Sequence, residues 1–150
     1  MGQRLLLVRW HSGGGTEGKK FRLRPWILEL ALTHSVILIT PDHRLEPEHD
    51  WAETIDDLKS FRLWVENKLP GVLGKQCNVV QIDLANVAVV GESAGGWSSD
   101  YSVLLPGLFS WSFEAVTLQY SPLDGVVRWP SLRASNRKYQ SACWLITLRV

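Results

Sequence analysis

The sequence is poor in cysteine, in uncompensated charge and in long apolar runs. Its two cysteines, Cys77 and Cys143, are too few for a disulfide framework and lack the spacing of a metal site. A net charge of +1 gives no electrostatic reason to expect nucleic acid or a membrane surface as a partner. No run approaches a membrane span, and the apolar residues 5–8 are too few for a signal peptide. A cytoplasmic location is therefore the default expectation.

The pattern of apolar residues predicts strands and helices in alternation. A chain of 150 residues with 45% hydrophobic content is long enough for one domain with a real core. Alternation of this kind predicts an α/β fold, with a mostly parallel sheet and helices on both faces. The predicted strands are residues 4–10, 36–39, 87–90 and 115–120, and the predicted helices are residues 25–34, 50–69 and 94–105.

The longest predicted helix has clear ends. Asp50 and Glu53 have the spacing of a capping box, and Pro70-Gly71 is expected to end the helix. Residues 72–85 show no regular period and are expected to link elements. Residues 144–150 are compatible with a further strand. The apolar positions that predict the buried stripe are Trp51, Ile55, Leu58, Phe61 or Arg62, Val65 and Leu69.

The strongest chemical signal is Gly91-Glu92-Ser93-Ala94-Gly95, which lies between a predicted strand and a predicted helix. This is the G-x-S-x-G nucleophile elbow, in which a sharp turn exposes a serine hydroxyl. The turn crowds the strand against the helix, and Gly91 and Gly95 lack the side chains that would clash. It also directs the N–H of Ala94 toward the site, at a helix N-terminus that favours a developing oxyanion. Such a short pattern also arises by chance, so its context matters.

A glycine-rich loop, His11-Ser12-Gly13-Gly14-Gly15, follows the first predicted strand. A phosphate loop would need a hydroxyl residue after Gly18-Lys19, and Lys20 stands there. A dinucleotide loop would need G-x-G-x-x-G at the start of a helix, and the pattern fails at the same place. An oxyanion loop of the His-Gly-Gly-Gly type fits better, because the sheet topology brings this loop to the same edge as Ser93.

A third motif, Asp42-His43-Arg44-Leu45-Glu46-Pro47-Glu48, is predicted to be a loop because it contains Pro47 and many ionisable groups. His43 and His49, with the nearby carboxylates, suggest a metal site. Pro47 rules out a helical register here, and no fourth ligand pattern appears. An ion-pair cluster around Arg44 is the better interpretation, so no metal is expected.

Together the three motifs resemble the hormone-sensitive-lipase-like branch of the α/β hydrolases, also called the α/β hydrolase fold-3 group. That family carries His-Gly-Gly-Gly, Asp-Tyr-Arg-Leu-x-Pro-Glu and Gly-Asp/Glu-Ser-Ala-Gly-Gly in this order. The segment Tyr120-Ser121-Pro122-Leu123-Asp124 is also similar to the family's sequence after the strand that follows the elbow. The resemblance covers residues 4 to about 125, and residues 125–150 form a tail that does not align with it.

The resemblance implies a serine carboxylesterase or lipase-like enzyme that hydrolyses small-molecule esters through an acyl-enzyme, without a cofactor. It implies that Ser93 is the nucleophile. The oxyanion hole would be formed by the N–H groups of Gly13, Gly14 and Ala94. The residues that would support these motifs are His11, in a structural role, and Gly91, Glu92 and Gly95.

The chain departs from the family pattern at three places. Ser12 replaces the first loop glycine, which is expected to strain the loop, and His43 replaces the usual tyrosine. The third departure concerns the triad, whose order in this fold is Ser, then Asp or Glu, then His. No histidine follows Ser93, and Asp124 matches a position too early for the triad acid. We expect residues 1–150 to be one partial domain that lacks the N-terminal cap and the C-terminal strands carrying the triad acid and base.

Two main hypotheses follow for function. The first is an esterase whose chain, taken alone, is impaired, since loss of a triad member costs on the order of 10⁴-fold or more in kcat. The second is a non-catalytic α/β hydrolase relic that binds a ligand or a partner through the same pocket. A nucleotide-binding module is a third possibility, and the elbow argues against it. The sequence also predicts an unpaired edge on the last strand and leaves the oligomeric state open.

Overall fold

The computed structural model describes residues 2–76, 80–104, 107 and 110–119. These residues form an α/β fold around a four-stranded parallel sheet of order β2-β1-β3-β4. The parallel sheet predicted from the sequence is confirmed. Its elements are β1 (Gly2–Trp10), α1 (Pro25–Thr33), β2 (Ile37–Ile39), α2 (Trp51–Asn67), α3 (Leu69–Gln76), β3 (Val80–Glu92), α4 (Ala94–Leu104) and β4 (Phe113–Gln119).

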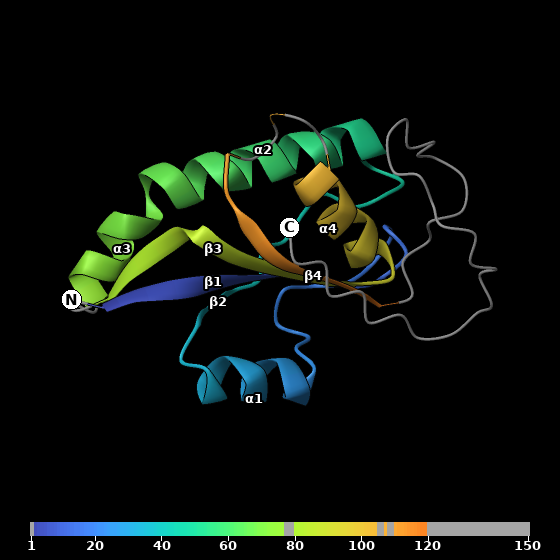
Figure 1. Ribbon diagram of the computed structural model, residues 1–150. Helices are drawn as coiled ribbons and strands as arrows, with labels where there is room; N and C mark the ends of the chain where they lie inside the picture. The colour runs from blue at the N-terminus through green and yellow to red at the C-terminus, as the bar shows by residue number, and fades with distance from the viewer. Residues whose placement is uncertain (1, 77–79, 105–106, 108–109, 120–150) are drawn as a thin grey trace, which may run out of the picture.

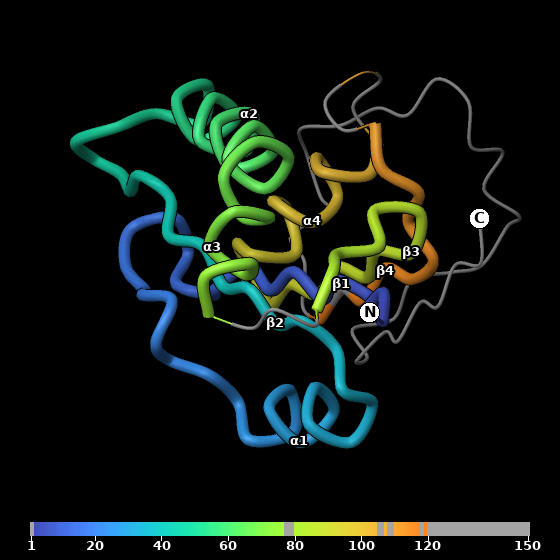
Figure 2. The backbone as a smooth tube through the Cα atoms, turned by 90° about the vertical axis from the view of Figure 1, so that its left-hand side faces the viewer, coloured from blue at the N-terminus to red at the C-terminus, as the bar shows by residue number. Residues whose placement is uncertain are grey.

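Helices cover both faces of the sheet. Figures 1 and 2 show α2, α3 and α4 on one side and α1 on the other. The alternation of side chains along β1 explains this arrangement, because successive residues point to opposite faces. Leu6 and Val8 pack in the core under α2, where they meet Leu58 and Val65, whereas Leu7 packs on the α1 side. The central strands are therefore apolar on both faces, as parallel strands usually are.

Helix α2 begins where the sequence predicts. The Asp50 carboxylate accepts the Glu53 backbone N–H at 2.9 Å, and the Glu53 side chain accepts the Asp50 N–H at 3.1 Å. This reciprocal capping box satisfies two N–H groups that have no partner within the helix. Leu58 and Val65 on the predicted stripe are fully buried. None of the helices in the described part of the chain combines the length and hydrophobicity needed to cross a bilayer.

Helix α1 buries less of its surface than expected. Ile27 and Ala31 of the predicted face are buried, but Trp26 and Leu30 are 37% and 39% exposed. Most residues of this short helix are apolar, so the sequence marks no single buried stripe. Residue spacing alone could not show which of them face the sheet.

Two expectations about the middle of the chain are wrong. Pro70-Gly71 does not end the helical region, because Pro70 lies in the first turn of α3, where proline is tolerated. The expected linker also contains the start of β3, which begins at Val80. Its pairing with β1 is interrupted: Leu5 pairs with Asp83 and Leu6 with Val87. The Asp83 carboxylate accepts the Ala85 N–H at 3.0 Å, and this local turn conceals the strand pattern.

Several sequence-based predictions concern residues outside the described ranges. They are the last residues of the third helix and the fourth strand, the turn at residues 121–125, the possible strand at 144–150, and both cysteines. Among the described residues, β4 pairs only with β3. Aggregation through an unpaired edge of this strand stays a prediction.

Two glycine substitutions should affect stability in opposite directions. A Cβ at Gly95 would lie 2.2 Å from the Trp10 carbonyl oxygen, whereas nothing lies within 4 Å of one at Gly74 in α3. Gly95→Ala should lower the free energy of unfolding by about 2 kcal/mol or more, because backbone atoms must move. Gly74→Ala should raise it by roughly 0.5–1 kcal/mol. Urea titration would measure both, and equal effects would contradict the crowding at Gly95.

Candidate active site

Ser93 lies in a strained turn between β3 and α4. Its φ of 54° is in the left-handed region, which a residue with a side chain seldom adopts. Hydrogen bonds on both sides hold this conformation. The Ser93 N–H donates to the Gln119 carbonyl at 2.7 Å, and the Ser93 carbonyl accepts the Gly96 N–H at 2.8 Å. Ser93 is half-buried, while every other residue from 91 to 100 is buried, so the turn exposes this one position.

The two glycines of the motif are required by space. A Cβ at Gly91 would lie 2.0 Å from the Gly95 carbonyl oxygen and 2.4 Å from the Ser99 hydroxyl. A Cβ at Gly95 would meet the carbonyl oxygens of Trp10 and His11 at 2.2 and 2.6 Å. Such distances leave no room for a methyl group. The crowding of strand against helix, inferred from the sequence, is therefore found at both positions.

The glycine-rich loop has backbone conformations that suit glycine. Gly13, Gly14 and Gly15 have φ values of 137°, 63° and 82°. The Gly13 carbonyl closes the turn by accepting the N–H groups of Thr16 and Glu17 at 3.1 and 2.9 Å. Ser12 is not among the non-glycine residues with positive φ, so the expectation that this serine strains the loop is wrong.

The sheet brings this loop to the elbow. Strands β1 and β3 are parallel neighbours, with Trp10 aligned to Gly91, so the loop and Ser93 follow strand ends at the same edge. The contact between Gly95 and the His11 carbonyl joins the start of α4 to the start of the loop. Ser93, Ala94, Gly13 and Gly14 therefore belong to one region of the fold.

Two buried histidines stack behind the loop. The rings of His11 and His43 lie 4.3 Å apart and are nearly parallel, at 9°. Each Nδ1 lies within hydrogen-bond distance of a backbone carbonyl, 3.0 Å for His11 to Ser12 and 2.9 Å for His43 to Arg44. Burial lowers the pKa of His11 below its usual value, and the charges of His43 and Arg9 lower it further, although Ser12 and Asp42 oppose this. His11 thus lies in a buried environment, where its ring stacks on that of His43.

Arg44 joins the third motif to helix α2. Its guanidinium lies 2.9 Å from both the Glu53 and Asp57 carboxylates, and its backbone N–H donates to Asp57 at 2.7 Å. The ion-pair cluster expected around Arg44 is confirmed. The same loop also supports the glycine-rich loop, because the Glu46 N–H donates to the Gly15 carbonyl at 2.8 Å.

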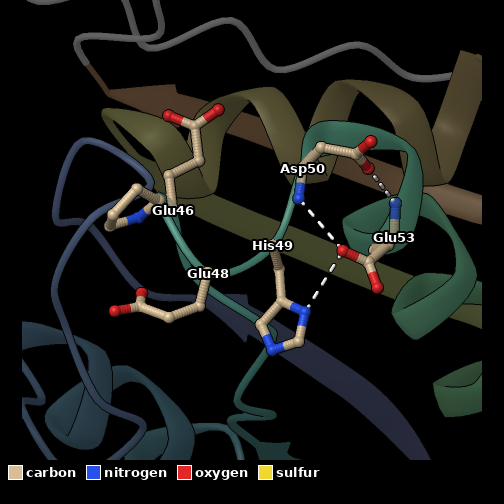
Figure 3. Close-up of a pocket in the computed structure, with 6 residues that line it drawn as sticks. Glu46, Glu48, His49, Asp50 and Glu53 are labelled. Atoms are coloured by element: carbon tan, nitrogen blue, oxygen red, sulfur yellow. Dashed lines mark hydrogen bonds and ion pairs between the residues drawn. The ribbon is translucent and has the colours of Figure 1, made fainter.

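A shallow pocket of about 460 Å³ is lined by residues 46–50 and Glu53. Its carboxylates do not converge on a point: Figure 3 shows the Glu46 and Glu48 side chains pointing in different directions. Glu53 is already bound to His49 Nδ1 at 3.1 Å and to the Asp50 N–H. Among the described residues, no three His, Cys, Asp or Glu side chains are arranged to hold a metal.

Sequence reasoning missed two contacts at the site. Arg9 and Arg24 both bond to the Glu92 carboxylate, and the side chains of Arg9 and Glu92 are only 1% and 7% exposed. The Trp51 ring packs on Gly15, and a Cβ added at Gly15 would lie 2.9 Å from that ring. A charged residue inside an otherwise apolar strand was the available signal for Arg9, because a buried charge needs a partner. No local pattern indicated the contact of Trp51.

The histidine rings that make hydrogen bonds in the described part of the chain make them away from Ser93. His11 bonds to Ser12, His43 to Arg44 and His49 to Glu53. These contacts give no indication that one of the three rings acts as a base toward Ser93.

The stacked histidines predict acid sensitivity. The folded state lowers the pKa of His11, so the unfolded chain binds more protons. Stability should be complete above a pH of about 6.5 and should fall as the pH drops below that value. Urea titrations between pH 7.5 and pH 5 should show this slope, and His11→Asn should flatten it. An unchanged slope in the variant would contradict the assignment, and His34→Asn, an exposed site, is the control.

Carboxylesterases are among the relatives that sequence comparison finds for this chain. Probable carboxylesterase M8 of Phoma sp. is 33% identical over 121 residues, which cover 79% of this chain and 37% of that protein. Carboxylesterase NlhH of Mycobacterium tuberculosis is 31% identical over 91 residues, which cover 61% of this chain and 26% of that protein. The chain therefore spans well under half the length of these relatives.

Solved structures show the same fold. The esterase of Pyrobaculum calidifontis superposes with a TM-score of 0.63 at 24% identity, covering 81% of this chain and 38% of that one. Esterase 2 of Thermogutta terrifontis, phosphonylated by sarin, superposes with a TM-score of 0.62 at 23% identity, covering 79% and 44%. Residues 7–138 match the family described as the alpha/beta hydrolase fold, which extends the similarity beyond the limit near residue 125 expected from the motifs. The chain belongs to the alpha/beta hydrolase fold family.

Proposed function

We propose that this chain carries the nucleophile and the oxyanion hole of an enzyme that hydrolyses small carboxylic esters. The observation that carries the proposal is Ser93: it has a φ of 54°, lies at the N-terminus of α4 and is the one half-buried residue in a buried segment. Strain of this kind persists only where the surrounding structure enforces it, and it concentrates at functional sites. The carboxylesterase names of the relatives support the same class of reaction.

The proposed reaction has two steps. The Ser93 hydroxyl oxygen attacks the ester carbonyl carbon while a base takes its proton. The resulting oxyanion is stabilised by N–H groups of Ala94, Gly13 and Gly14, which cost no reorganisation because the backbone already holds them. The alcohol leaves with the proton, which forms the acyl-enzyme. In the second step the base takes a proton from water, the water oxygen attacks the acyl carbon, and Ser93 leaves with the proton. No cofactor takes part.

The base and the acid that orients it belong outside the described residues. In this fold they follow the nucleophile in the order acid, then histidine. The matched proteins are more than twice as long as the segment they share with this chain, so they have room for both groups. We propose that residues 1–150 alone react slowly, by about 10⁴-fold or more relative to a complete triad.

A second function is a non-catalytic module that binds ester-like or acyl ligands. It is favoured by one observation: in the described part of the chain, the hydrogen bonds of His11, His43 and His49 go to residues other than Ser93. Such a module would keep the elbow and the glycine-rich loop as architecture. A cytoplasmic location stays a prediction under either function.

Labelling with a fluorophosphonate probe separates the two functions. An activated serine attacks the phosphorus and becomes covalently modified, which mass spectrometry of peptides detects. Because the chain alone is proposed to react slowly, we expect slow modification at Ser93 that disappears in Ser93→Ala and persists in Ser60→Ala, an exposed serine on α2. A folded chain that is not labelled would favour the binding module instead.

The oxyanion loop offers a matched pair of substitutions. A Cβ at Gly13 would lie 1.8 Å from the Glu17 carbonyl oxygen, whereas one at Gly14 would meet nothing closer than 3.9 Å. Gly13→Ala should displace the loop and slow labelling of Ser93 by about 10²-fold or more. Gly14→Ala should slow it by less than about tenfold, since only the backbone strain of φ 63° is added. Equal rates in the two variants would contradict a role for this loop.

A further inference from the structure

We propose that Arg9 is a positioning residue that acts through Glu92 to hold Ser93 against the glycine-rich loop. The proposal rests on Ser93 being the nucleophile, as inferred above. Arg9 Nη2 donates to Glu92 Oε2 at 3.0 Å, and both side chains are buried. Glu92 directly precedes Ser93, and Arg9 lies two residues before His11, where the loop begins.

This ion pair joins the two strand ends on one face of the sheet. Val90 lies on the same face of β3 as Glu92, and it packs with Leu7 and Ile27 on the α1 side. The contact of Gly95 with the Trp10 and His11 carbonyls joins the same two strand ends through α4, on the opposite face. The ion pair and the Gly95 contact lie on opposite faces of the sheet. Together they oppose rotation of the elbow about the end of β1, which either contact alone would allow.

The hydrogen bonding of Arg9 suggests that this residue orients the Glu92 side chain more than it stabilises the fold. Its Nε and Nη1 atoms are buried and find no hydrogen-bond partner among the described residues, so the part of the chain that the structure describes compensates its charge only partly. A buried ion pair with unsatisfied atoms is a weak source of stability, because desolvation offsets the attraction. A charge-assisted bond in a low-dielectric interior is nevertheless stronger than a bond between neutral groups. It fixes the Glu92 side chain and therefore the backbone that leads into the strained Ser93.

Arg24 provides the matched control. Its Nε bonds to the other oxygen of the same carboxylate at 3.2 Å, but its side chain is 64% exposed and it precedes α1, not the glycine-rich loop. Water can replace such an exposed partner. Arg24 also keeps the Glu92 carboxylate partnered when Arg9 is removed, so Arg9→Met leaves no isolated buried charge.

The test resolves fluorophosphonate labelling of Ser93 into probe affinity, KI, and the first-order rate, kinact. Arg9→Met should lower kinact by about tenfold or more with KI nearly unchanged, because a small displacement of the nucleophile slows attack without removing the pocket. Arg24→Met should change kinact by less than about twofold. Arg9→Lys keeps the charge and should restore most of kinact. Equal effects of the two methionine variants, or a loss confined to KI, would overturn the proposal.

Two further arms keep the outcome decisive. If Arg9→Met does not fold, the double variant Arg9→Met/Glu92→Gln, which removes both charges, is used in the same labelling measurement. The same loss of kinact is expected. If the parent chain is not labelled at Ser93, the proposed function fails, and hydrogen exchange then tests the coupling by itself. Arg9→Met should speed exchange in peptides covering both residues 11–18 and residues 93–97, relative to Arg24→Met. Faster exchange in neither peptide, or only in the first, would overturn the coupling.

Discussion

The close approach of Gly95 to the carbonyl oxygens of Trp10 and His11 is the contact on which the site depends. It places the first turn of α4 directly on the end of β1, at a distance that no side chain permits. The N-terminus of α4 and the glycine-rich loop are thereby brought together from segments about 80 residues apart in the chain. Alignment of Trp10 with Gly91 in the sheet makes this approach possible.

The loops behind this contact are held by polar interactions anchored on α2. Arg44 bonds to Glu53 and Asp57, and the neighbouring Glu46 N–H holds the Gly15 carbonyl. The capping box at Asp50 starts the helix that supplies these carboxylates. Because the loops have little regular structure, their backbone groups need such partners, and α2 provides a rigid support for them. The third motif therefore contributes to the site through support of the glycine-rich loop.

Local signals in the sequence were enough for much of the fold. The apolar runs of β1, β2 and β4, the capping box of α2 and the G-x-S-x-G turn each depend on residues close together in the chain. Helix α3 and the start of β3 were missed, because Pro70 can begin a helix as well as end one, and because Asp83 forms a local turn inside a strand. The buried faces of α1 were only partly predicted, since an almost wholly apolar helix has no stripe to identify.

The sequence by itself determined the α/β class, the family and the identity of the candidate serine, because short motifs and residue periodicity carry that information. Only the tertiary structure decided which groups meet. The Arg9–Glu92 ion pair, the stacking of His11 on His43, and the covering of Gly15 by Trp51 all join residues far apart in the chain. The physical reason is that side-chain contacts depend on strand order and register, which no local pattern encodes.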